Sequence, residues 1–450
     1  IRGIWGAGDL TFHEYPEQSG IFYGYSYAYI RNANDIRLFA SLSERAGYTI
    51  ITFNANASTV SIEKDLEGVT YKKGQEITLL ELCDIIDNID NAFDKYFEEA
   101  KIDKPRAKRM CGYTTWYNYY TSVTEEIVER DLEAIAKLGS KIDIFQVDDG
   151  YERTVGDWLY HDEKKFPSGM KLIADNIHKH DMLAGLWLAP FAATPKSYIY
   201  NKHKDWFVKN KNGKIPFASQ NWGGFYALDI YNNEVRQYLK EVFDTVLNVW
   251  GYDMVKLDFL YACCIIPFNG KSRGEIMCDA MDLIRELCGD KLILGCGVPL
   301  VPAFGKVDFC RIGADMALSW GKKPFSREDV STKHALLNTI FRRELDGRAF
   351  LNDPDVFLLR DNNIKMSFEQ RKLIAETASL FGNLLFVSDD VSTYNNNQKD
   401  CFINVTTRNK ADINYVNMDS DGDISIKYTL DGEKKGYCFN INSGDKKVLI

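Results

Sequence analysis

Residues 142–150 read Ile-Asp-Ile-Phe-Gln-Val-Asp-Asp-Gly, an apolar strand-like run that ends in two carboxylates and a glycine. Similar apolar runs lie on both sides of it, with amphipathic helical patterns between them. They lie at 109–113, 183–188, 254–259, 291–294, 307–311, 348–351 and 384–387. Continuous apolar runs separated by helices indicate a parallel sheet that is buried on both faces. Eight such runs predict an α/β fold, a closed (β/α)8 TIM barrel.

Helix signals support this alternation. The first helix is expected to begin at Ser122, which forms a capping-box pattern with Glu125, and to end before Gly139. Two further helices are expected, one from Ser168 and one over 275–288.

Short alternating runs flank the predicted barrel on both sides. Before it, 21–30 and 48–53 predict antiparallel strands, and 82–100 predicts an acidic helix. After it, strand-like runs predict a small antiparallel domain; they lie at 401–407, 424–430 and 436–441. We therefore predict three domains: a strand-rich N-terminal part with a linker helix (1–105), the barrel (106–389) and a C-terminal β domain (390–450).

Composition narrows the class of protein. The 450 residues carry 55 Lys plus Arg and 64 Asp plus Glu, a net charge of −9, which argues against nucleic-acid and anionic-membrane partners. No apolar run is long enough to span a membrane, and no basic-then-apolar leader is present. The ten scattered cysteines favour a reducing, cytoplasmic location, although a chain that begins at Ile1 leaves room for a preceding leader. The six histidines lack metal-ligand spacing, so no metal and no cofactor are expected.

Polar and aromatic residues gather where the predicted strands end, which is the functional face of a TIM barrel. They are Trp116, Asp148, Asp149, Trp187, Lys256, Asp258, Cys296, Arg311, Asp315, Asn352, Asp353, Ser388 and Asp389. Lys256 and Asp258 are two residues apart on one strand, so both point into the barrel. An ion pair that only holds the barrel together is the alternative for these two. Several carboxylates at one rim, however, are expensive to desolvate and indicate a reaction site.

Paired carboxylates with tryptophans predict cleavage of a glycosidic bond. One carboxylate attacks the sugar, and a nearby Lys256 would keep Asp258 ionised for that role. The other protonates the leaving oxygen, and Asp315, on the loop after the sixth strand, suits it. Residues 419–423 resemble a calcium loop, but Leu430 stands where the bidentate Glu belongs, so a polar hairpin turn is expected.

At this point the motifs resemble those of the α-galactosidases of glycoside hydrolase family 36, most of all its compact bacterial branch. The matching strings are Phe145-Gln-Val-Asp-Asp-Gly150, Gly156-Asp-Trp158, Phe166-Pro-Ser-Gly169, Gly185-Leu-Trp-Leu-Ala-Pro-Phe191, Lys256-Leu-Asp-Phe259, Gly295-Cys-Gly297, Arg311-Ile-Gly-Ala-Asp315 and Leu351-Asn-Asp-Pro-Asp355. They span the whole predicted barrel in order. The resemblance also implies that residues 1–105 contain part of a β-sandwich.

The resemblance implies a role for each site residue. Asp258 would form the galactosyl-enzyme, and Asp315 would act as acid and then as base. The family positions that contact the sugar correspond to Trp116, Asp148, Asp149, Trp187, Lys256, Cys296 and Arg311. The implied activity is that of a retaining exo-α-galactosidase on small α-galactosides such as the α-1,6-linked raffinose series.

Other functions remain open from the sequence. The same motifs would suit an α-N-acetylgalactosaminidase, a galactosyl transferase of the same clan or a non-catalytic galactoside-binding protein. The oligomeric state is not determined either, and a homo-oligomer is one option.

Overall fold

The computed structural model describes residues 18–32, 35–321 and 329–449. Its centre is a parallel sheet in the order β16-β15-β14-β13-β9-β8-β7-β18-β17. These strands are β7 Met110–Thr114, β8 Ile144–Val147, β9 Leu183–Leu188, β13 Met254–Leu257, β14 Leu292–Gly295, β15 Phe309–Arg311, β16 Leu351–Asp353, β17 Val356–Phe357 and β18 Leu384–Val387. The two ends of the sheet, β16 and β17, are halves of one stretch of chain, so the sheet closes on itself. The predicted (β/α)8 barrel is confirmed.

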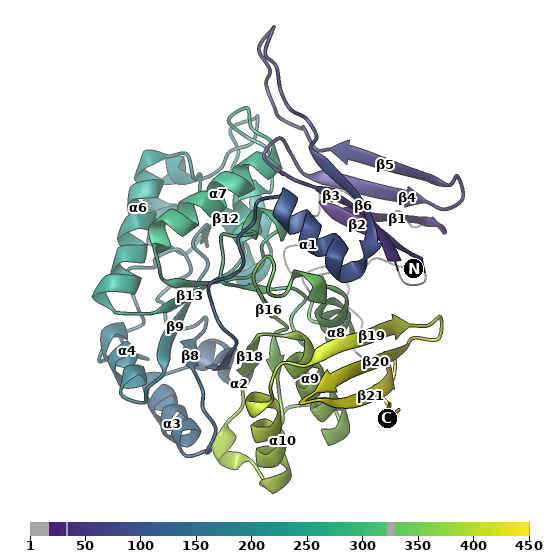
Figure 1. The fold of residues 1–450 in the computed structure, drawn as a ribbon. Helices are drawn as coiled ribbons and strands as arrows, with labels where there is room; N and C mark the ends of the chain where they lie inside the picture. Colours follow the sequence, from purple (N-terminus) through teal and green to yellow (C-terminus); the bar gives the residue numbers. More distant parts are fainter. Residues whose placement is uncertain (1–17, 33–34, 322–328, 450) are drawn as a thin grey trace.

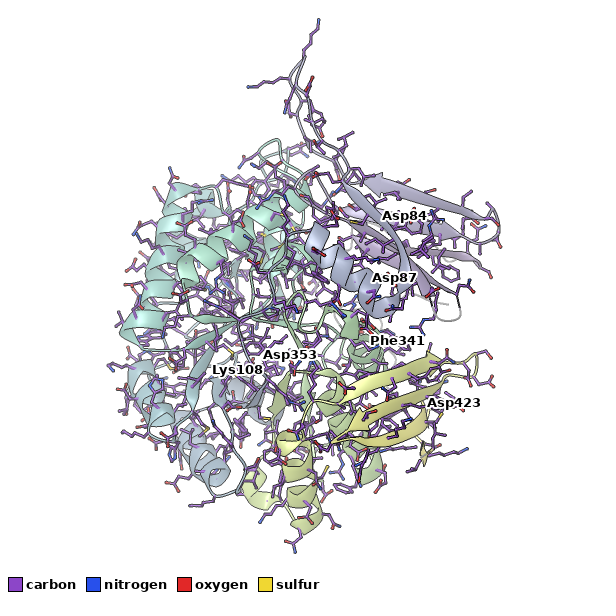
Figure 2. The ribbon with its side chains drawn as sticks, viewed as in Figure 1. Asp84, Asp87, Lys108, Phe341, Asp353 and Asp423 are labelled. Atoms are coloured by element: carbon purple, nitrogen blue, oxygen red, sulfur yellow. The ribbon has the colours of Figure 1, made fainter. Side chains whose placement is uncertain are left out.

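The seventh predicted run, at 348–351, is wrong in position because it ends where β16 begins. Arg348 instead lies before the strand and forms ion pairs with Asp90 and Asp94 of the N-terminal region. The strand itself ends at Asp353, a fully buried carboxylate in the centre of the barrel (Figure 2). A charged residue can occupy this buried position because Arg311 of the neighbouring strand lies 3.1 Å from it.

Helices cover the outside of the barrel (Figure 1). The longer ones are α3 Glu125–Ala136, α4 Met170–His178, α6 Asn233–Asp244, α7 Arg273–Cys288, α8 Thr332–Phe341 and α9 Phe368–Phe381, and two short ones are α2 Trp116–Tyr119 and α5 Tyr198–Lys202. The expected start at Ser122 is wrong, because Ser122 ends a separate 3-10 turn and Thr124 caps α3 by accepting the Ile127 N–H. The helix α7 ends at Gly289 as predicted.

Two antiparallel sheets precede the barrel. One contains β1 Ile21–Tyr25, β4 Thr49–Asn54 and β5 Thr59–Lys64, and the other contains β2 Tyr27–Asn32, β3 Asp35–Ser41 and β6 Leu82–Asn88. Phe39 of β3 and Phe53 of β4 lie 6.0 Å apart, so the sheets face each other. The predicted helix at 82–100 is wrong in its first half. Residues 82–88 alternate in burial and pair with β3, and the helix α1 Ile89–Glu99 begins only after Asn88.

A four-stranded antiparallel sheet follows the barrel. It consists of β19 Asp412–Met418, β20 Asp423–Leu430, β21 Glu433–Asn440 and β22 Lys446–Val448. The strand predicted at 401–407 is wrong: these residues belong to the helix α10 Asn396–Thr407, which begins with a capping box and packs against α9. In the hairpin at 419–423, the Asp419 carboxylate accepts two backbone N–H groups of its own turn. The domain boundaries at 105 and 389 remain predictions.

An insertion separates β9 from β13 at the carboxyl end of the barrel. It contains a small antiparallel sheet of β10 Ala192–Ala193, β11 Phe217–Ser219 and β12 Phe225–Ala227. Phe225 lies 5.5 Å from Phe259, the residue that follows Asp258, so the insertion lies beside the strand ends. Among the described residues, no helix has both the length and the apolar character needed to cross a membrane.

Candidate active site

A buried ion pair joins two of the predicted residues across the barrel interior. Lys256 of β13 donates from Nζ to Asp148 Oδ2 at 2.8 Å, and neither residue is more than 7% exposed. Burial alone would raise the pKa of Asp148, but Lys256 outweighs it and holds that pKa below its usual value. The side-chain amide of Gln146 and the Asp149 N–H also donate to Asp148, which is therefore an ionised acceptor.

Asp258 stands two residues further along the same strand. The Trp187 indole N–H donates to its Oδ2 at 3.2 Å, and the Phe259 N–H donates to its Oδ1 at 2.8 Å. Gly297 packs so closely that a Cβ there would lie 3.1 Å from Oδ1. These contacts hold the carboxylate in one orientation.

The electrostatic partner of Lys256 differs from the expectation. Its ion pair is with Asp148, not with Asp258. Burial raises the pKa of Asp258, while Lys256 and the two N–H donors oppose that rise without cancelling it. The sequence could not reveal this, because both carboxylates follow apolar strands that end near the same lysine.

Arg311 organises the opposite side of the site. Its guanidinium donates to Asp315 Oδ1 at 2.8 Å and to Asp353 Oδ2 at 3.1 Å, and it lies 2.7 Å from Asp355 Oδ1. Arg311 is buried, but the Asp315 side chain is 44% exposed. Asp315 is thus a carboxylate that is anchored at one oxygen and open to solvent, as a group that meets a leaving group should be.

Asp149 lies under the insertion. Trp222 donates from its indole N–H to Asp149 Oδ2 at 2.9 Å, and the Glu152 carboxyl also bonds to Asp149. Burial raises the pKa of Asp149, and burial together with Asp149 raises the pKa of Glu152 well above its usual value. Two adjoining buried carboxyls cannot both ionise, so Glu152 holds the shared proton and Asp149 the charge.

Aromatic rings and a thiol complete the rim. Trp187 makes edge contacts with Trp158 and Trp222 at 5.8 and 5.9 Å. Trp116 begins α2 directly after β7, is half-buried, and packs against Tyr120. Cys296 follows β14 and is buried, and burial raises the pKa of its thiol well above the usual value, so it stays protonated.

The structure separates the remaining strand-end residues from this cluster. Asp389 forms an ion pair with Arg360 at 3.0 Å and accepts the Tyr394 hydroxyl at 2.6 Å. Ser388 donates to a backbone carbonyl of β7, and Asn352 to the Arg342 carbonyl. These side chains hold loops together, so their strand-end position alone was a misleading signal.

Four residues near the site were missed as site residues by the sequence reasoning. They are Trp222, Glu152, Tyr117 and Asp355. Trp222 lies in the insertion between β9 and β13, Glu152 and Asp355 lie beside or within quoted motifs, and Tyr117 directly follows Trp116, but the contacts of all four depend on strand order. Among the described residues, no group of three or more His, Cys, Asp or Glu is arranged to hold a metal ion.

Comparisons with known proteins show which sequences and folds the chain resembles. The family model described as Melibiase matches residues 88–268. Alpha-galactosidase Mel36A of Lactobacillus acidophilus is 25% identical over 259 residues, which cover 55% of this chain and 34% of that protein. The chain thus spans about a third of the length of the curated relatives it matches.

Solved structures resemble a larger share of the chain. An α-galactosidase from Thermus thermophilus, solved in complex with p-nitrophenyl α-D-galactopyranoside, is 25% identical with a TM-score of 0.73, over 92% of this chain and 80% of that one. The same enzyme has been solved with stachyose. The family 36 α-galactosidase AgaA from Geobacillus stearothermophilus shares the fold, with a TM-score of 0.64 at 15% identity over 98% of this chain and 68% of that one. The resemblance to glycoside hydrolase family 36 that the sequence motifs predict is therefore confirmed.

Proposed function

We propose that this chain is a retaining exo-α-galactosidase that hydrolyses terminal α-D-galactosyl residues, such as the α-1,6-linked residues of raffinose-type oligosaccharides. The observation that carries the proposal is the pair of unlike carboxylates. Asp258 is held by two N–H donors in the barrel interior, and Asp315 is anchored to Arg311 with an open oxygen. The choice of galactose as the sugar rests on the α-galactosidases that the chain resembles.

The reaction proceeds in two displacements. In the first, an Asp258 oxygen attacks the anomeric carbon while Asp315 gives a proton to the glycosidic oxygen, so the leaving group departs as an alcohol. In the second, Asp315 takes a proton from water, and the water oxygen displaces Asp258. Two inversions release galactose with the starting α configuration. The carboxylates Asp148 and Asp149 accept galactose hydroxyls, and Trp116 and Trp187 pack against the ring beside Lys256, Cys296 and Arg311.

Asp258→Ala tests the nucleophile. Turnover of p-nitrophenyl α-galactoside is expected to fall by about 10⁴-fold or more and to return partly with azide, which gives the β-galactosyl azide. Asp253→Ala is the matched control, because Asp253 precedes the same strand at the opposite end of the barrel and bonds to His178. Activity retained in Asp258→Ala rejects the assignment.

Further measurements test retention and separate the other functions. Rapid NMR of the first product reports retention as α-galactose, and a crystallographic carboxylate separation of about 5–5.5 Å supports it, against about 6.5–9.5 Å for inversion. A 2-acetamido substrate identifies an N-acetylgalactosaminidase, and product analysis at high sucrose identifies a transferase. Sugar binding by calorimetry without turnover identifies a binding protein.

A further inference from the structure

A buried aspartate with a strained backbone lies at the break in the seventh barrel strand. Asp355 separates β16 from β17, is 1% exposed, and adopts a φ of 77°, in the left-handed region that residues with a side chain rarely occupy. Such a conformation is strained and persists only where the surroundings hold it. The contacts of Asp355 must therefore compensate for this strain.

These contacts reach Asp315 from two sides. The Met316 N–H, which directly follows Asp315, donates to Asp355 Oδ2 at 2.6 Å. Arg311 Nη2 lies 2.7 Å from Asp355 Oδ1, while Arg311 Nη1 donates to Asp315 at 2.8 Å. One carboxyl thus fixes both the backbone beside Asp315 and the guanidinium that anchors its side chain.

Tyr117 joins the same network from α2. Its hydroxyl donates to Asp355 Oδ2 and accepts the Met316 N–H at 3.1 Å. Burial raises the pKa of Tyr117 well above the usual value, so the hydroxyl remains a donor. Because Trp116 precedes Tyr117, the network also connects the acid loop to the helix that carries a predicted sugar contact.

The charges around Asp355 are unbalanced. One cation, Arg311, faces the carboxyls of Asp315, Asp353 and Asp355, and the phenol of Tyr117 is the other titratable group in contact. Burial raises the pKa of Asp355 to about 7; Asp315 and Asp353 add to the rise, and Arg311 opposes it. When ionised, Asp355 competes with Asp315 for the guanidinium.

We propose that Asp355 is a positioning residue that sets the orientation of Asp315, and the share of Arg311 charge that Asp315 receives, for its work as acid and base. The inference rests on the proposed role of Asp315. It predicts that a change at Asp355 damages proton donation to the leaving group more than attack on the sugar.

Asp355→Asn tests this with two substrates. Melibiose needs a proton on its leaving oxygen, but p-nitrophenol leaves readily without one. We expect kcat/KM to fall by about 10- to 100-fold for melibiose, since a misplaced acid loses much of a 10²- to 10⁴-fold effect, and by less than about threefold for the aryl galactoside. The alkaline limb of the melibiose profile should move to lower pH, because the substitution removes a negative charge that faces the Arg311–Asp315 pair.

Asp389→Asn is the matched control. Asp389 is equally buried at the end of the next strand and likewise contacts an arginine, a tyrosine hydroxyl and backbone N–H groups, but its partners are Arg360, Tyr394 and Leu359 in place of Arg311, Tyr117 and Met316. Asp389→Asn should lower kcat/KM by the same factor for both substrates. Tyr117→Phe should repeat the unequal loss at about 3- to 10-fold for melibiose, and it decides the matter if Asp355→Asn does not fold.

An equal loss on both substrates with an unmoved pH profile overturns the proposal, since a purely structural role predicts that result. If the wild type turns over neither galactoside, the proposed function fails and this inference fails with it. If the wild type is active and the losses are equal, only this inference fails.

Discussion

The buried pair of Lys256 and Asp148 allows a quantitative test. Lys256→Met keeps the length of the side chain but removes its charge. Asp148 is 2% exposed and would lose its ion pair at 2.8 Å, although the donors Gln146 and the Asp149 N–H would remain. A buried carboxylate would then lack its cation.

Removing one partner of a buried ion pair costs about 3–5 kcal/mol, although three hydrogen-bond donors to Asp148 would remain: Thr114, Gln146 and the Asp149 N–H. The entropy of unfolding is about 2.1 cal/mol/K per residue, or about 0.9 kcal/mol/K for a chain of this size. The melting temperature is therefore expected to fall by about 3–5 °C at pH 7.

The loss depends on pH with a defined sign. In the wild type, the pKa of Asp148 lies below its usual value, so its contribution to stability is present above the unfolded pKa and is lost as the pH falls. In Lys256→Met, only the remaining hydrogen-bond donors oppose burial, which raises that pKa, so stability is lost as the pH rises above about 4. The difference between the two proteins must widen from pH 4.5 to pH 8.

Calorimetric melts of Lys256→Met, Asp148→Asn and the double variant check this. The double variant should regain most of the loss and be more stable than either single variant, because each single variant leaves one buried charge unpaired and the double variant leaves none. Lys64→Met, which removes a buried lysine 3.8 Å from Glu44, should lose stability but keep activity. A difference that is the same at both pH values, or a double variant as unstable as Lys256→Met, refutes the reasoning.

Three further predictions follow from the contacts. Glu152→Gln should leave KM within about twofold, whereas Glu152→Ala should raise it about tenfold because Asp149 loses a buried donor; equal KM values contradict this. Trp187→Phe removes an N–H that lowers the pKa of Asp258, so kcat should fall about tenfold and the acid limb of kcat/KM should move to higher pH; an unmoved limb counts against it. Because the pKa of Asp355 is raised to about 7, its contribution to stability is lost as the pH rises from about 4 to 7. The melting temperature of Asp355→Asn relative to that of the wild type should therefore rise from pH 5 to pH 8. A difference in melting temperature that stays constant over this range contradicts the prediction.

The barrel strands show which parts of a fold the sequence reveals. The runs at 183–188 and 384–387 match β9 and β18 residue for residue, because these strands are buried on both faces and entirely apolar. The strand β16 was misplaced because Asp353 interrupts the apolar pattern. Arg311, the counter-ion of Asp353, lies opposite it in register on β15. That pairing depends on the order of strands in the sheet and cannot be deduced from either segment alone.

The same distinction applies to the candidate site. Spacing along one strand indicated that Lys256 and Asp258 point into the barrel, and the chain does place them there. The partner of Lys256 depends on which strand lies two positions away in the sheet, β8, and on how deep its terminal carboxylate reaches. Periodicity predicts the direction in which a side chain points but not how deep in the barrel it lies. The sequence therefore could not decide whether Asp148 or Asp258 forms the ion pair with Lys256.

Three residues that contact the site carboxylates or their neighbours share a backbone property. Asp355, Trp222 and Phe259 adopt φ values of 77°, 55° and 53°, although each carries a side chain that disfavours this region. Local propensity predicts none of them, because only tertiary contacts hold such conformations. Asp355 accepts the N–H of Met316, which follows the predicted acid Asp315. Trp222 donates to Asp149, a predicted sugar-binding carboxylate, and the Phe259 N–H donates to Asp258, the predicted nucleophile. Since strain of this kind persists only where the surrounding structure compensates for it, its occurrence beside three carboxylates supports the proposal that the site is built to orient them.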